Sequence, residues 1–373
     1  MAHYFIFPEK DTTIFSHPTE QSLNTGLDEI LTLRDSESTT DLNHYPSRIL
    51  LQFKTKEWGD VINNIAPNKN VITASLKLYQ TEHRELAGIQ HIEVYPLAES
   101  WINGTGRLAN SPQITNGCSW KFRDGTDNRF SNTIGTSWNT GSSDGTFPNF
   151  RTASFIDGAK GGGLWWVNGD TQGTGFEASK SIDFNEDLDL NINITAPLLK
   201  QYAFEFESAG TPSGIPNNGF ILKRSESQEF TTRDDGELNY FSMDTHTIYP
   251  PYLDISWDDS TYNATESKIK KTGECYVTLR NNKEEYKTIE EPTFRLNVRE
   301  LYPTRKFVTS SNFLDVNYFT SKSFYSLVDY ATEETIIPFG PTSKLSADAE
   351  GMYFKLYMNG LQEERYYKLL FKH

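Results

Sequence analysis

The chain has 373 residues, with 50 acidic and 35 basic side chains and a formal net charge of −15 at pH 7. An acidic balance of this size argues against nucleic acid as a partner, because nucleic acids are bound by basic surfaces. No stretch approaches the 18 consecutive apolar residues that indicate a membrane-spanning helix, so a membrane is not expected as a partner either.

The first hundred residues predict a series of short β-strands. In ITASLKLYQ (72–80) apolar residues alternate with polar ones, and HIEVYPL (91–97) repeats the pattern. Alternation with a period of two is typical of half-buried strands in an antiparallel sheet. The other strands expected in this part cover residues 3–7, 12–16, 29–35 and 48–54.

One early segment has a helical period instead. In KEWGDVINNI (56–65) the apolar residues Trp58, Val61, Ile62 and Ile65 recur at the spacing of one helix face. We therefore expect a short helix there, with this stripe in the core.

Residues 104–175 have a different composition, dominated by Gly, Asn, Ser, Thr and Asp. We expect short strands and long ordered loops, because a structureless insert of this length is uncommon in a compact domain. Three acidic loops in or near this region, 124–128, 142–149 and 185–191, carry the oxygen ligands that calcium prefers. The same Asp-Gly and Asn-Gly pairs are common in turns. Calcium is therefore a hypothesis beside ordinary turn chemistry, and no other cofactor or metal is expected.

The tryptophans of this region allow two interpretations. Trp138, Trp165 and Trp166 lie in Gly-rich segments, with Asn and Asp residues nearby, as in a platform that stacks on sugar rings. Tryptophan is also a common core residue, and the Trp-Trp pair between Leu164 and Val167 fits a strand that alternates in and out of a sheet. The sequence leaves both a glycan site and a core role open.

Strand patterns return after residue 175, in LDLNINITAPLLK, YAFEFE, NGFILKR and LDISW. Residues 258–274 are polar and lack apolar periodicity, which predicts a domain boundary or an exposed linker. From 274 to 373 seven or eight strands at regular spacing predict a second all-β unit. Cys118 and Cys275 have no paired spacing and are expected to be free thiols.

Several pieces between residues 40 and 259 occur in a distinctive order: YPSRILLQF, ITASLKLYQ, IEVYPLAESWINGTGR, GCSWKFRDG, NNGFILKRS and YPPYLDISW. This order resembles the DNRLRE-type β-sandwich domain found in bacterial surface proteins and tailed-phage virion proteins. In that family a strand leads into a Trp-x-x-Gly-x-Gly break, and a loop similar to W-x-x-R-D-G follows. The resemblance covers residues 1–259, and residues 274–373 resemble no family that can be named.

The resemblance implies a role for the break at WINGTG (101–106). It looks like the corner of a sandwich, where the chain leaves one sheet and enters the long loops. Trp101 would then plug the edge of the core, while Gly104 and Gly106 would supply the turn dihedrals.

The resemblance also implies a jelly-roll-like sandwich with long loops over 1–259. Together with the patterns that follow it, this predicts an all-β fold, with a linker over 260–273 and a smaller β domain over 274–373. The whole chain looks like a virion structural protein of a tailed, myovirus-like phage, in the tail, baseplate, neck or fibre. The N-terminus MAHYFIFPEKDTT lacks the features of a signal peptide, which suits assembly in a host cytoplasm and residence in the virion. The alternative is a carbohydrate-binding module that recognises host surface glycans.

Catalytic motifs are missing from the sequence. There is no GxSxG, HExxH or phosphate-binding loop motif, and the seven histidines show no ligand spacing. We therefore expect no enzymatic activity. His246, close to Asp244, is expected to be a buried and hydrogen-bonded histidine.

The end of the chain, MYFKLYMNGLQEERYYKLLFKH, is unusually rich in apolar and aromatic residues for a terminal strand. Strands that end a sheet are usually shortened, charged or covered. This strand can lie inside its own sandwich, or it can dock onto another virion protein or a second copy of the chain. The residues expected to form such an assembly interface are Tyr366, Tyr367, Leu369 and Phe371.

Overall fold

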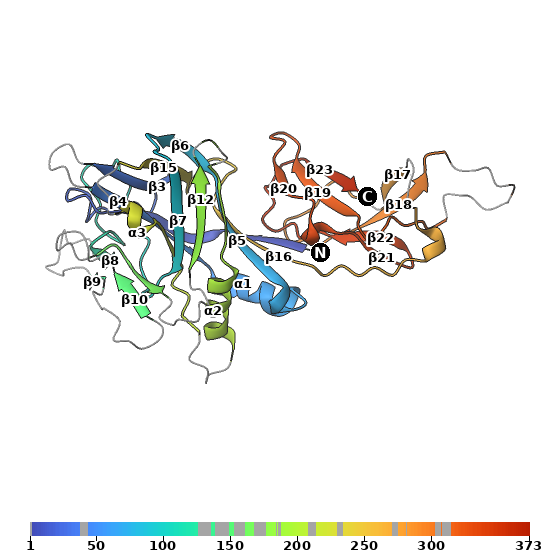
Figure 1. Ribbon diagram of the computed structural model, residues 1–373, viewed down its shortest axis with the longest axis horizontal. Coiled ribbons are helices and arrows are strands. Elements are labelled where there is room, and N and C mark those ends of the chain that lie inside the picture. Colours follow the sequence, from blue (N-terminus) through green and yellow to red (C-terminus); the bar gives the residue numbers. More distant parts are fainter. Residues whose placement is uncertain are drawn as a thin grey trace. The chain divides into compact units, whose positions relative to one another are not determined.

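The computed structural model describes residues 2–37, 44–125, 136–138, 149–152, 161–167, 177–183, 185, 188–207, 214–229, 234–270, 275–280, 282–302, 307 and 315–373. The fold is all-β and built from antiparallel sheets, as the sequence predicts. The chain forms two compact units (Figure 1). Unit 1 comprises Met1–Phe5, Val61–Thr73 and Asp254–His373, and unit 2 comprises Ile6–Asp60 and Ala74–Leu253.

These units differ from the predicted division at residues 259, 260–273 and 274. The described part of the expected linker, 260–270, forms backbone hydrogen bonds with other segments of unit 1. The amide of Asn263 donates to the carbonyl of Ala347 at 2.9 Å, and the amide of Lys270 donates to the carbonyl of Tyr318 at 2.7 Å. The polar side chains of this segment are typical of a linker, but its backbone hydrogen bonds hold it in a defined position in unit 1.

Unit 2 is dominated by one large curled sheet (Figure 1). The strand order is β12-β7-β14-β4-β3-β15-β6, and β2 pairs with β4 off this path. The strands are β2 (Pro8–Phe15), β3 (Ile30–Glu37), β4 (His44–Phe53), β6 (Gln80–Arg84), β7 (Ile89–Pro96), β12 (Ala178–Asp183), β14 (Phe220–Arg224) and β15 (Gly236–Phe241).

A second sheet has the order β1-β16-β5-β13, formed by β1 (Ala2–Ile6), β16 (Tyr252–Trp257), β5 (Ile72–Leu78) and β13 (Leu190–Asn193). In β5 the residues Ile72, Ala74, Leu76 and Leu78 are buried and those between them are half-buried. This is the alternation that the sequence predicts. Leu76 lies opposite Ile192 of β13, which continues the apolar face of the sheet.

The helix predicted over 56–65 is confirmed. It consists of α1 (Thr55–Asp60) and a π-helical turn, η1 (Val61–Ile65), and it buries Trp58, Val61 and Ile62. The remaining short helices of the described residues are η2 (Lys69–Val71), α3 (Glu226–Glu229), η3 (Glu266–Lys268) and η5 (Pro341–Ser343).

The strand predicted over the YAFEFE segment is wrong, because this segment belongs to helix α2 (Thr195–Phe206). The side chain of Asn193 accepts a hydrogen bond from the amide of Thr195 at 2.9 Å and so supports the start of the helix. Leu198, Gln201 and Tyr202 are buried at the spacing of one helix face. The five residues AFEFE alternate between apolar and polar, but a segment this short does not distinguish the strand period of 2 from the helix period of 3.6.

Unit 1 contains two small sheets beside its part of the second sheet. One has the order β17-β18-β22-β21 and the other β20-β19-β23. Their facing sides share an aromatic core in which Phe354 stacks on Tyr325 at 4.4 Å and on Phe294 at 5.2 Å. The strands are β17 (Cys275–Arg280), β18 (Thr293–Glu300), β19 (Phe324–Asp329), β20 (Thr335–Ile337), β21 (Ser346–Asp348), β22 (Gly351–Lys355) and β23 (Tyr367–Lys372).

Candidate functional sites

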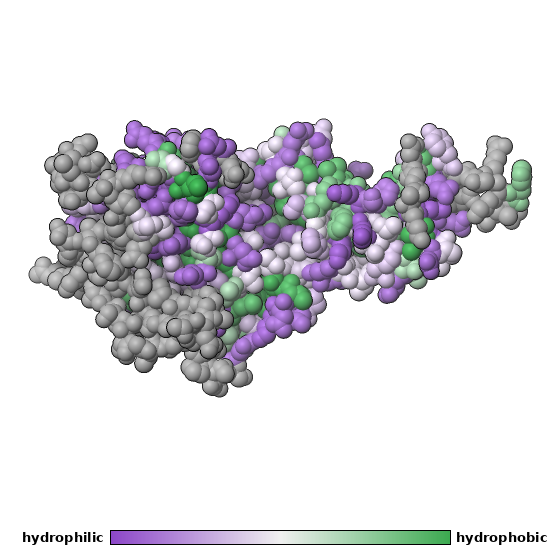
Figure 2. Space-filling view, viewed as in Figure 1, coloured by the Kyte–Doolittle hydropathy of each residue, from purple (hydrophilic) through white to green (hydrophobic). Residues whose placement is uncertain are grey.

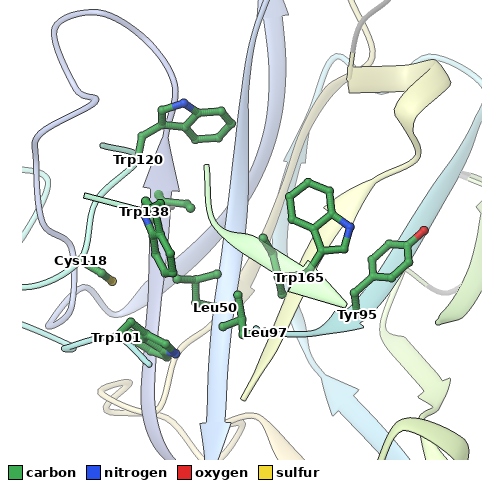
Figure 3. Packing of buried hydrophobic residues seen from close by; sticks show 10 residues of the cluster. Leu50, Tyr95, Leu97, Trp101, Cys118, Trp120, Trp138 and Trp165 are labelled. Atoms are coloured by element: carbon green, nitrogen blue, oxygen red, sulfur yellow. The ribbon is translucent and has the colours of Figure 1, made fainter. Parts of the chain in front are cut away.

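One face of the large sheet carries a cluster of tryptophans (Figure 3). On the sheet side, Ile221 of β14 lies opposite Leu50 of β4 and Tyr95 of β7, so these three side chains share a face. Two small ladders lie in the same part of unit 2: β8 (Phe122–Asp124) pairs with β9 (Thr136–Ser137), and β10 (Asn149–Thr152) pairs with β11 (Leu164–Val167). The cluster consists of Ile14, Leu50, Tyr95, Leu97, Trp101, Cys118, Trp120, Trp138, Trp165 and Ile221.

Trp101 has the position that the sequence predicts for a plug. Its side chain is 2% exposed, and its indole Nε1 donates to the carbonyl of Asn218 at 3.0 Å. The ammonium of Lys10 lies 5.6 Å from the ring centroid, which adds a cation–π contact. Trp101 therefore joins the loop region to the end of β14 through packing and one hydrogen bond.

The two glycines after Trp101 act in different ways. Gly104 has φ +83°, a conformation that glycine adopts without strain. Gly106 has no such dihedral, and the prediction that it supplies one is wrong. A Cβ at Gly106 would lie 2.2 Å from the carbonyl oxygen of Asn24, so this position requires glycine because the backbones approach closely.

Asn24 organises this corner, a role that the sequence gave no signal for. Its side-chain nitrogen donates to the carbonyls of Asn103 and Cys118 at 2.6 and 2.8 Å. Its side-chain oxygen accepts from the amides of Gly26 and Gly106 at 3.2 and 2.8 Å. All four hydrogen-bonding positions of a fully buried amide are therefore used.

The three tryptophans considered as a sugar platform differ in their burial. Trp138 is 2% exposed and donates its indole N–H to the carbonyl of Ser119 at 2.9 Å, and Trp165 is 5% exposed. Trp166, the next residue of β11, is half-buried. Buried rings offer no face to a saccharide, so Trp138 and Trp165 have the core position that the sequence left open as the other interpretation.

A buried network of charges lies beside the tryptophans, and no pattern in the sequence predicted it. Arg48 of β4 forms two hydrogen bonds with Glu229 of α3, from Nε to Oε1 at 2.9 Å and from Nη2 to Oε2 at 2.6 Å. Its Nη1 donates to the carbonyl of Gly162 at 2.6 Å. The Arg48 guanidinium lies 4.8 Å from the ring centroid of Trp120 and 5.0 Å from that of Trp165. Arg48 thus links the sheet to a helix and to the tryptophan cluster.

Lys223 of β14 extends this network toward β7. Its ammonium lies 3.0 Å from Glu93 and 3.7 Å from Glu229, and Lys223 lies opposite Glu93 in the strand register. The ammonium is also 5.8 Å from the ring centroid of Trp165. Buried charges are stable only when they are paired and hydrogen-bonded, a condition that these groups meet. The network is suited to fixing the loops onto the sheet.

A second buried polar group, formed by Arg224, Asp35 and Tyr240, is less fully bonded. Arg224 donates Nη2 to the carbonyl of Gly236 at 2.9 Å, but its Nε and Nη1 have no hydrogen-bond partner among the described residues. The same is true of both carboxylate oxygens of Asp35 and of the Tyr240 hydroxyl. Burial raises the pKa of Asp35 to about 7, while the charge of Arg224 opposes this rise. Asp35 therefore titrates close to neutral pH.

Asp11 of β2 is a second carboxyl with this property. Burial raises its pKa from 3.8 to about 7, the hydrogen bond from the Met243 amide (2.6 Å) lowers it, and the charge of Asp244 raises it further. The folded state therefore binds this proton more tightly than the unfolded chain does. The resulting stability is fully present below pH 3.8 and is lost as the pH rises to about 7.

We expect the Asp11→Asn variant to be more stable than the wild type at pH 8, by on the order of 2–4 kcal/mol. Asparagine keeps an oxygen that accepts from the Met243 amide, but it cannot carry a buried negative charge. Urea unfolding at pH 4, 6 and 8 measures the effect, which should disappear at the lowest pH. The exposed Asp60→Asn variant is the control and should follow the wild type throughout; an Asp11→Asn variant that does the same contradicts the assignment.

The four residues predicted as an assembly interface lie in or next to the last strand, β23, and differ in their exposure. Tyr366 is 83% exposed, whereas Tyr367, Leu369 and Phe371 are half-buried. Phe371 contacts the ring of Phe354 at 5.9 Å between centroids, so its side chain faces the aromatic core of unit 1. β23 pairs with β19 on one edge, and no described strand pairs with its other edge.

The other candidate groups can be placed briefly. His246, expected to be buried, has a side chain that is 87% exposed and lies 3.7 Å from Glu29. Cys118 and Cys275 are both free. Within the described ranges no three His, Cys, Asp or Glu side chains gather as a metal-ligand set. Of the predicted acidic loops, 124–128 and 142–149 lie largely outside those ranges, whereas 185–191 is described except for residues 186 and 187. No helix in the described part of the chain is long and apolar enough to cross a membrane.

No protein-family model matches the sequence. No curated protein matches it either.

Proposed function

We propose that this protein is a structural, non-enzymatic component of a tailed-phage particle, in the tail, baseplate, neck or fibre. The proposal is supported by the sequence resemblance given above and by the distribution of exposed apolar side chains. The five most exposed large apolar residues of the described chain all belong to unit 1: Ile289 (86%), Tyr302 (82%), Phe307 (99%), Tyr330 (61%) and Tyr366 (83%).

This distribution is the observation that carries the proposal. Among the described residues of unit 2, the most exposed large apolar side chain is that of Phe204, which is 55% exposed. Figure 2 shows hydrophobic residues among hydrophilic ones over the region that β19 and β23 occupy in Figure 1. Aromatic residues dominate the binding energy of protein interfaces, and apolar side chains left in water favour association. Unit 1 is therefore the part of the chain through which we expect it to attach to other particle proteins.

The first experiment asks whether the chain is a particle component. Phage that carry the gene are grown, and their particles are purified from the lysate on a density gradient. The particles are then labelled with antibodies raised against the full chain. We expect the antibody to mark one fixed position on tailed particles, and mass spectrometry to give a constant copy number. A protein found only in the soluble fraction, with unlabelled particles, overturns the proposal.

The second experiment asks whether unit 1 makes the attachment. A phage lacking the gene is complemented with the double variant Ile289→Asp and Tyr302→Asp, or with Phe204→Asp of unit 2 as the matched control. Because all three side chains are exposed, each variant should fold, which far-UV circular dichroism checks. We expect the copy number of the double variant per particle to fall at least tenfold and that of the control to stay at the wild-type value. Normal retention of the double variant shows that attachment does not use this surface.

A further inference from the structure

The edge of β23 with which no described strand pairs offers a regular row of backbone groups. The amide of Tyr330 donates to the carbonyl of Tyr366 at 2.8 Å, in register with the pairs from Asp329–Tyr367 to Phe324–Lys372. In an antiparallel ladder the hydrogen-bonded positions alternate along each strand. Residues 366, 368, 370 and 372 therefore direct their N–H and C=O groups toward β19. Residues 367, 369 and 371 direct theirs toward the unpaired edge.

The sequence of this strand is complementary to itself in the antiparallel direction. If two copies of β23 pair with Leu369 opposite the partner's Leu369, then Tyr367 lies opposite the partner's Phe371. On the other face Tyr366 lies opposite the partner's Lys372, which pairs an aromatic ring with a cation. Aromatic pairs and cation–aromatic pairs across strands are both stabilising.

The register also satisfies the backbone. Residues 367, 369 and 371 of one copy would face residues 371, 369 and 367 of the other, and these are the positions whose N–H and C=O groups are directed outward. The pairing has two-fold symmetry, so each contact occurs twice and the interface closes on itself. It also keeps Tyr367, Leu369 and Phe371 on one face, where all three are half-buried and Phe371 contacts Phe354 in the core of its own unit.

We propose that the protein forms a two-fold symmetric dimer through antiparallel pairing of β23 with β23 of a second copy, centred on Leu369. The two three-stranded sheets then join into one of six strands. The dimer goes beyond the particle role proposed above and does not depend on it. It is tested on the purified full chain alone, whereas the particle experiments test the function, so either proposal can fail without the other.

Sedimentation equilibrium of the full chain tests the dimer. We expect the wild type to dimerise and Leu369→Pro to raise the dissociation constant at least tenfold, because proline removes an outward N–H of the edge. Leu369 is half-buried, so thermal unfolding must show that this variant remains folded. A wild type that stays monomeric at several hundred micromolar overturns the proposal.

A charge exchange tests the register with side chains that are exposed. Tyr366→Lys should weaken the dimer about tenfold, because it places two cations opposite each other. Adding Lys372→Glu should restore it, since residues 366 and 372 then form an ion pair between copies. Within one chain these residues are about 20 Å apart along the strand, too far for an internal ion pair. The control Tyr366→Lys with Lys368→Glu should not restore the dimer, and equal rescue by both double variants shows that the register is wrong.

Discussion

The Glu229→Gln variant should lose about 3–5 kcal/mol of unfolding free energy in unit 2. Glu229 accepts two hydrogen bonds from Arg48 and lies 3.7 Å from Lys223, and the side chains of both Glu229 and Arg48 are only 1% exposed. The amide has nearly the shape of the carboxylate but no charge, so the Arg48 guanidinium would remain buried without its partner. The cost of a buried and unpaired charge is far larger than the value of one hydrogen bond.

Tryptophan fluorescence during urea unfolding measures this effect in the intended unit. Six of the seven tryptophans lie in unit 2, all except Trp257. The matched control is Glu82→Gln, the same substitution in the exposed ion pair between Glu82 and Arg84, whose side chains are 50% and 65% exposed. The control should cost about 0.5 kcal/mol or less. Equal losses in the two variants mean that the Arg48 network does not stabilise the fold.

Removing the charges of both Arg48 and Glu229 tests whether the loss in Glu229→Gln comes from an unpaired buried charge or from poorer packing. In the double variant Arg48→Met and Glu229→Leu no unpaired charge remains at these two positions. Replacement of a buried pair by apolar residues of similar volume is often close to neutral. We therefore expect the double variant to be more stable than Glu229→Gln alone. A double variant that is the less stable of the two shows that the charges contribute more than they cost.

Local patterns predicted the strands well and the long-range contacts poorly. The alternation in β5 and the helical stripe at Trp58 depend on neighbours within a few residues, so the sequence displays them directly. The partner of Arg48 lies 181 positions away, and nothing in RILLQF indicates it. A basic residue within an apolar strand could have been recognised as a buried charge that needs a carboxylate, but not which one.

The candidate interface at β23 is a second case in which the sequence predicts the strand but not its contacts. The sequence predicts that the terminal strand is rich in aromatic residues, but not which of its faces meets the core. That division follows from the pairing of β23 with β19, which turns Phe371 inward and leaves Tyr366 in solvent. The tryptophans illustrate the same limit, since the sequence left both a sugar platform and a core role open for Trp138, and packing against the sheet places it in the core.

The Trp101→Ala variant should lose about 3–5 kcal/mol of unfolding free energy, the usual range for truncation of a buried large aromatic. Trp101 packs in the cluster with Cys118 and Trp138 (Figure 3). Its indole N–H donates to the carbonyl of Asn218. The variant therefore loses buried apolar area, gains a cavity and leaves one carbonyl without its donor.

The matched control for this substitution is Trp166→Ala, because Trp166 is the half-buried neighbour of the cluster. Its truncation should cost about 1 kcal/mol, since less apolar surface is withdrawn from water at this position. Thermal and urea unfolding followed by circular dichroism at strand wavelengths compares the two variants without depending on the tryptophan that was removed. If Trp101→Ala is as stable as Trp166→Ala, then Trp101 is not the residue that fixes the corner, and the four hydrogen bonds of Asn24 must hold it without the indole.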